Sequence, residues 1–240
     1  MSKLKAAQAL AFPGGKLEFI DDDHVCFLHG NCVAVAKVDA PERVEFLTHA
    51  FERGVSAFAT NHRTSCVALC PRAHDPSVLV ARWPSREVKA TLTGGTDLEY
   101  VAVAFSRDGG RVVAISAATD HALFVWDVAS QAKLISAPLL SASRFVSVNP
   151  ADPDLLCTGG RKGLVLWRLS NILGERSLAA TKLVPPDAAA DGAAAADEEE
   201  EDEADEDADE EGRAAGDGFD ARFTAHCWGV GDVVYAVNHR

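Results

Sequence analysis

Tryptophan recurs in two near-identical apolar segments of this chain, and their spacing constrains the fold more than any other feature. The segment 123–128 reads LFVWDV and contains Trp126, and 41 residues later the segment 164–169 reads LVLWRL and contains Trp167. The segment 78–83 is in the same phase, with Ala81 in the tryptophan position. A period of about 40–45 residues with a Trp-Asp ending is typical of β-propeller blades. We therefore expect an all-β fold of WD40-type blades.

Short β-branched segments separated by turn residues fill most of the chain, as four-stranded blades require. The clearest blade is predicted at 100–140, where Tyr100 opens the first strand and the turn at Asp120 precedes the strand that carries Trp126 and Asp127. Two blades are predicted before it and one after it, with strands at the following residues: 17–20, 25–28, 32–36 and 43–47; 55–60, 65–69, 77–83 and 87–92; 144–149, 155–158 and 163–169. In the last of these blades we expect Gly159-Gly160 to form a turn, since glycine pairs favour turns.

The predicted architecture is an incomplete propeller of about four blades plus the start of a fifth. We expect an N-terminal extension at 1–16, blades at 17–184, a disordered acidic loop at 185–218 and the start of the next blade at 219–240, which includes Trp228. The last predicted blade stops at Arg240, so we expect the chain to be the first part of a longer protein. A truncated gene model is the simplest explanation of the missing blades. The end blades should then keep apolar faces that no neighbour covers.

The charge of the chain is concentrated in one tract. Residues 197–211 hold thirteen carboxylates and no base, and the net charge is −13, so the rest of the chain is neutral. Because dense like charge opposes collapse, we expect a solvated loop, and the alternative is a segment that binds basic partners. The tract opens with the following residues: Asp197, Glu198, Glu199, Glu200, Glu201, Asp202 and Glu203.

The remaining composition argues against several classes of function. No basic cluster favours nucleic acid, and no apolar run is long enough to span a membrane. Cys66 and Cys70 lie near His62 and His74, but no second cysteine pair completes a zinc pattern, so core thiols are the expected role. We find no catalytic set and expect neither enzyme activity nor a cofactor or metal. The expected role of the conspicuous side chains is structural, as blade residues: Trp83, Tyr100, Asp120, Trp126, Asp127, Trp167 and Trp228.

Several motifs occur in the order in which one family has them: FID at 19–21 with HGN at 29–31, PSVLV at 76–80, LEY at 98–100, and HCW at 226–228. Over about 17–175 and 222–237 the chain resembles the cilia- and flagella-associated protein 43 family of ciliary WD-repeat proteins. This resemblance implies a cytoplasmic, cytoskeletal protein of the cilium or flagellum axoneme. It also implies partners there: a related ciliary WD-repeat protein, an inner dynein arm that the family helps to tether, and the doublet microtubule. By this resemblance we expect the printed 240 residues to lack the family's remaining blades, second propeller and coiled coil.

A second function remains open at this point. The acidic tract is also compatible with a nuclear WD-repeat adaptor or a histone chaperone that binds basic tails. Further blades and a heptad-patterned tail beyond Arg240 would favour the ciliary alternative.

Overall fold

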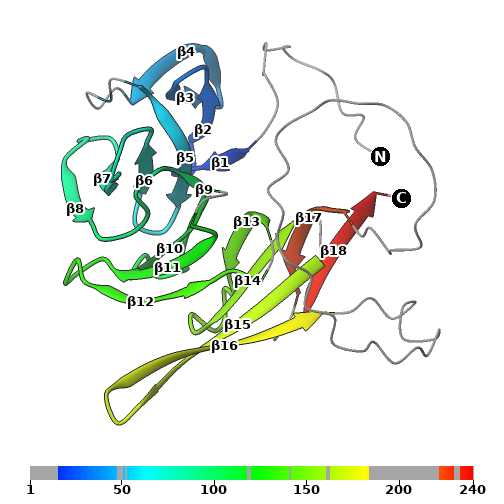
Figure 1. The fold of residues 1–240 in the computed structure, drawn as a ribbon. Helices are drawn as coiled ribbons and strands as arrows, with labels where there is room; N and C mark the ends of the chain where they lie inside the picture. Colours follow the sequence, from blue (N-terminus) through cyan, green and yellow to red (C-terminus); the bar gives the residue numbers. More distant parts are fainter. Residues whose placement is uncertain are drawn as a thin grey trace, which may run out of the picture.

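The computed structural model describes residues 16–47, 51, 53–117, 120–140, 142–160, 163–183, 222–229 and 233–239. Within these ranges every regular element is a β-strand, in four four-stranded antiparallel sheets and one two-stranded sheet (Figure 1). Each four-stranded sheet takes four consecutive strands in chain order, which is the construction of a propeller blade. The predicted all-β, WD40-type fold is confirmed.

The four complete blades have strands of three to ten residues. Their strands are β1 (Leu17–Phe19), β2 (His24–His29), β3 (Cys32–Lys37) and β4 (Ala40–Leu47) in blade 1; β5 (Val55–Asn61), β6 (Cys66–Pro71), β7 (Val78–Arg82) and β8 (Val88–Leu92) in blade 2; β9 (Tyr100–Phe105), β10 (Arg111–Ser116), β11 (Ala122–Asp127) and β12 (Lys133–Pro138) in blade 3; β13 (Ser143–Val148), β14 (Leu155–Gly160), β15 (Gly163–Ile172) and β16 (Glu175–Leu183) in blade 4. A fifth sheet contains β17 (Arg222–Trp228) and β18 (Val234–His239).

The blades stand side by side around part of a ring that the described residues do not close (Figure 1). The first strand of each blade is the inner one, and β9 packs beside both β5 and β13. Alternation of side chains along each strand gives every blade two apolar faces, one for each neighbour. Three separate cores result, one at each junction between consecutive complete blades.

The strand pairing confirms the predicted phase of the repeat. Trp126 pairs with Val112 in blade 3, and Ala81 pairs with Val67 at the equivalent position in blade 2. Both residues face the preceding blade, because Trp126 packs in the core between blades 2 and 3 and Ala81 in the core between blades 1 and 2. In blade 2 a different tryptophan, Trp83, occupies that core just after β7 ends.

The prediction for Gly159-Gly160 was wrong. Both glycines lie inside β14, and the chain reverses only after Gly160. A Cβ atom on Gly159 would overlap with the ring of Phe145 and with Leu164, so this glycine is needed for close packing and not for a turn. The fourth strand of the blade, β16, was not predicted, because its sequence ERSLAATKL is polar and exposed along most of its length.

Blade 1 ends the array at one side. Leu17 and Phe19 point away from blade 2, since Glu18 between them contacts blade 2 through the backbone amide of Thr60 at 2.6 Å. Leu17 is 49% exposed and Phe19 is 50% exposed. The free face of blade 1 is therefore apolar and half-exposed at Leu17 and Phe19, although Ala34 and Ala36 on the same face are buried.

Candidate functional site

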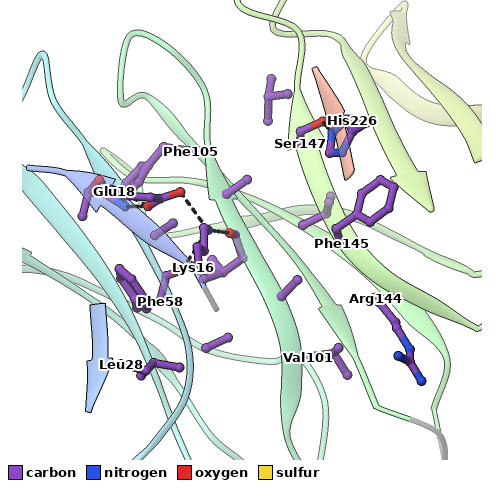
Figure 2. Close-up of a pocket in the computed structure, with 18 of the residues that line it drawn as sticks. Lys16, Glu18, Leu28, Phe58, Val101, Phe105, Arg144, Phe145, Ser147 and His226 are labelled. Atoms are coloured by element: carbon purple, nitrogen blue, oxygen red, sulfur yellow. Dashed lines mark hydrogen bonds and ion pairs between the residues drawn. The ribbon is translucent and has the colours of Figure 1, made fainter. Parts of the chain in front are cut away.

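A cavity of about 600 Å³ lies along the axis around which the blades are arranged (Figure 2). Its walls come from the inner strands β1, β5, β9, β13 and β17. Small side chains line much of it, among them Ala57, Ala59, Ala102 and Ala104, so the inner strands meet at the axis without filling it. The cavity is the central channel of the partial propeller.

One side of this channel is held together by a lysine. Lys16 Nζ donates to the carbonyl oxygens of Phe58 at 3.0 Å and Val103 at 3.3 Å, and it forms an ion pair with Glu18 at 2.9 Å (Figure 2). These contacts join blades 1, 2 and 3 at the axis. Because its donors are already used, the Lys16 ammonium acts here as a structural link and is poorly placed to bind a ligand.

The opposite side of the channel joins blade 4 to the fifth sheet. Ser147 Oγ accepts a hydrogen bond from Trp228 Nε1 at 3.0 Å and also bonds to His226 Nε2. The His226 ring stacks on Phe145 with centroids 4.2 Å apart (Figure 2). Burial lowers the pKa of His226, which favours the neutral ring. A neutral Nε2 can accept the hydroxyl proton of Ser147, so one serine serves both side chains of β17.

Three of the predicted blade tryptophans lie in junctions between blades, and two of them, Trp126 and Trp167, occupy equivalent positions in their third strands. Trp126 is fully buried between blades 2 and 3, and its Nε1 donates to Thr93 O at 2.9 Å. Trp167 is buried between blades 3 and 4, and its Nε1 donates to Thr158 Oγ1 at 2.8 Å. Trp83 lies between blades 1 and 2. These three indoles face the preceding blade, whereas Trp228 belongs to an inner strand and lines the channel.

The other predicted blade residues lie close to the same junctions. Tyr100 is buried edge-on against the rings of Phe124 and Trp126, with centroids about 6 Å apart. Asp120 is exposed and accepts a hydrogen bond from the hydroxyl of buried Thr96. Asp127 accepts two hydrogen bonds of 2.7 Å from the amide and hydroxyl of Ser130, and these bonds hold the pKa of its carboxyl below the usual value.

None of these groups forms a reactive set. Cys66 and Cys70 are buried together in the core between blades 2 and 3, and burial raises the pKa of the Cys70 thiol. Across the residues that the structure describes, no three His, Cys, Asp or Glu side chains lie close enough to hold a metal ion. No helix in that part of the chain could cross a membrane. The acidic tract that begins at Asp197 lies outside the described residues.

The sequence analysis missed the residues that hold the channel together. Lys16 was assigned to the N-terminal extension, and Ser147 and Phe145 were noted only as parts of a strand. A lysine before the first strand and a serine inside an inner strand are common, so only their position at the axis reveals the contacts. The HCW motif was one available signal, since His226 and Trp228 share one face of a strand.

The chain is similar to proteins named as cilia- and flagella-associated. No family model matches it. It is 27% identical over 184 residues to cilia- and flagella-associated protein 43 of Xenopus laevis, which is 73% of this chain and 11% of that protein. It is 27% identical over 156 residues to cilia- and flagella-associated protein 44 of Trypanosoma brucei brucei, which is 61% of this chain and 9% of that protein. The chain thus spans about a tenth of the length of these relatives.

A shorter similarity is to a protein named as microtubule-associated. Echinoderm microtubule-associated protein-like 2 of Rattus norvegicus is 34% identical over 79 residues, which is 32% of this chain and 12% of that protein. Four consecutive four-stranded blades around an axial channel define the class of the protein, an open array of WD40-type propeller blades. Within this class, the chain is similar to the cilia- and flagella-associated protein 43 family, and the resemblance predicted from its motifs is confirmed.

Proposed function

We propose that this protein is a non-catalytic WD-repeat scaffold of the axoneme of motile cilia and flagella. The observation that carries the proposal is the similarity to cilia- and flagella-associated protein 43 over 73% of the chain, together with the blade architecture. The fold alone would not specify a function, since propellers carry many. The ciliary association is therefore taken from the relatives, and the location proposed is the axonemal cytoskeleton.

The finer part of the proposal concerns partners. We infer that the full-length protein acts with a related ciliary WD-repeat protein to position an inner dynein arm on the doublet microtubule, and that it thereby regulates the beat. Two kinds of relative support this, proteins named cilia- and flagella-associated protein 43 and 44 and a protein named as microtubule-associated. Neither nucleic acid nor membrane is part of the proposed set of partners.

A binding role fits the chemistry of the described surface better than catalysis does. The axial channel is lined by aliphatic, aromatic and hydroxyl side chains, by Glu18, Arg144 and His226, and by a lysine whose donors are already bonded. The proposed layout keeps an extension at 1–16, blades at 17–184, an acidic loop at 185–218 and a further blade from 219. Binding would then use the exposed loops and outer strands of the blades.

The test is the location and the loss of the full-length protein in cells with motile cilia. We expect a tagged full-length protein along the axoneme, and we expect its loss to change the waveform while axonemes still assemble. A tagged segment 187–217 alone serves as the control and should not reach the axoneme, because its charge is screened within about 8 Å at physiological salt. A full-length protein found in the nucleus and absent from axonemes would overturn the proposal in favour of the histone-binding alternative.

A further inference from the structure

The fourth strand of each complete blade lies farthest from the axis, and its outer edge is unpaired within the described residues. We call these four strands, β4, β8, β12 and β16, the outer strands. An unpaired edge exposes backbone N–H and C=O groups with which a strand of another protein can pair. Proteins protect such edges with short strands, prolines, charged side chains and shifts in register. The four outer strands differ in this protection.

Three of the outer strands are protected. Each of them shifts its register against the third strand of its blade. β4 contains Pro41 and three charged residues, and β12 begins at Lys133 and ends at Pro138. β8 has only five residues, and the side chain of Gln131 accepts a hydrogen bond of 3.1 Å from the Thr91 amide. These features oppose the addition of a further strand.

β16 has none of these features along its centre. It is the longest outer strand, with nine residues, and its pairing with β15 continues without a shift in register. It contains no proline, and its charged residues, Glu175, Arg176 and Lys182, lie near its ends. The centre, 177–181, has the sequence SLAAT, in which Leu178 is half-buried and the other side chains are small and exposed. The hairpin of β15 and β16 projects from the array (Figure 1), so another backbone can approach this edge closely.

The turn of this hairpin determines which backbone groups face the free edge. Leu173 and Gly174 have φ values of +54° and +91°, which is typical of a two-residue type I′ turn. In such a turn the following residue directs its N–H back to the preceding strand, so the Glu175 amide faces β15. Orientation alternates along an antiparallel strand. The outward N–H and C=O groups therefore belong to Arg176, Leu178, Ala180 and Lys182.

The side chains of these four residues indicate what kind of strand would fit. Leu178 packs on the core between blades 3 and 4, so all four lie on the face toward blade 3. Arg176 and Lys182 are exposed, and neither forms an ion pair with a described residue. Antiparallel pairing with a second copy of β16 would gather four such cations on one face. A strand with carboxylates opposite Arg176 and Lys182 would pair them instead.

We propose that the free edge of β16 binds an extended segment of a partner protein, which adds to blade 4 as an antiparallel fifth strand. The segment carries carboxylates six positions apart, opposite Arg176 and Lys182, and apolar residues opposite Leu178 and Ala180. This site does not depend on the proposed ciliary function, because it follows from the edge of β16 and its charges alone.

The experiment measures binding of a fluorescein-labelled peptide, ETVTVTE, to the intact chain by anisotropy. Its glutamates and valines would lie opposite the four outward residues of β16, and its threonines would face away. N-methylation of both valines should weaken binding at least about tenfold, because it removes two amide donors that point at β16. N-methylation of two threonines is the matched control and should change the affinity less than about twofold.

Variants of β16 test the same contact from the other side. Ala180→Pro removes one outward N–H without touching the pairing with β15, and it should weaken binding at least about fivefold. Ala180→Val keeps that amide and should not weaken binding. R176E/K182E should weaken binding of ETVTVTE at least about fivefold and strengthen binding of KTVTVTK by a similar factor. Circular dichroism checks that every variant keeps its strands.

Four results would overturn the inference. Failure of ETVTVTE to bind would exclude the proposed recognition. Equal affinity for the two N-methylated peptides would mean that the peptide does not add as a strand. Equal affinity in Ala180→Pro and Ala180→Val would place binding elsewhere. An intact chain that sediments as a dimer and becomes monomeric in Ala180→Pro would mean that a second copy occupies the edge. None of these results bears on axonemal location, which is measured separately.

Discussion

The junction between blades 2 and 3 differs from the free face of blade 1, although alternating strands form both. The junction is sealed, whereas the free face is partly exposed to solvent. Trp126 has no exposed surface, whereas Phe19 is 50% exposed. Both are aromatic residues in strands whose successive side chains point to opposite faces of the blade. The alternation therefore decides which side chains share a face, and the presence of a neighbouring blade decides whether that face is buried.

The largest expected effect comes from removing the indole at the sealed junction. Trp126→Ala should lower the free energy of unfolding by about 3–5 kcal/mol, because it leaves a cavity and frees Thr93 O from its hydrogen bond. Phe19→Ala on the open face should cost only about 1 kcal/mol or less. Urea unfolding of both variants measures the contrast. Similar losses in the two variants would show that the face of blade 1 is covered after all.

A smaller effect is expected from adding a methyl group at Gly159, where neighbouring side chains already occupy the space. Gly159→Ala introduces a methyl group against Phe145 and Leu164 in blade 4, and it should destabilise the protein by about 1–3 kcal/mol. Phe145→Ala removes the obstructing ring, so the double variant should lose less than the sum of the two single variants. Strict additivity in the double-mutant cycle would disprove the close contact.

The third comparison is between the junctions of complete blades and the junction between blade 4 and β17. Ser147→Ala removes the hydroxyl that serves Trp228 and His226, and it should weaken attachment of β17 by about 1 kcal/mol. Amide exchange should then quicken across 222–228 and stay unchanged across 100–105. Ser136→Ala, at an exposed position of β12, is the control. Equal changes in both segments would contradict a local role for Ser147.

The smallest effect is a dependence on pH at the same contact. Burial lowers the pKa of His226 in the folded chain below its unfolded value, so the unfolded state binds the proton more readily. This contribution to stability is complete at neutral pH and decreases as the pH falls below the ordinary histidine pKa, about 6.5. Unfolding at pH 7.5 and 5.5 should show a smaller decrease in His226→Gln than in the original chain. The same decrease in both would rule out His226 as the group responsible.

Much of the architecture could be predicted because the repeat is visible in the chain. The phase of Ala81, Trp126 and Trp167 fixed the third strand of three blades, and the strand pairing agrees with it. The prediction failed at Gly159, where the absence of a side chain lets the backbone of β14 lie close to Phe145 and Leu164. It also failed at β16, whose polar sequence carries no apolar alternation and whose pairing depends on β15.

The sequence by itself determined the order of strands, the period of the blades and the face on which each tryptophan lies, because these follow from local alternation and turn chemistry. Only the tertiary structure decided which groups meet across blades. Lys16 reaches carbonyls 42 and 87 residues away, and Ser147 meets His226 79 residues later. Contacts of this kind depend on how the inner strands converge at the axis. Convergence is set by packing between blades, and no single segment of sequence encodes it.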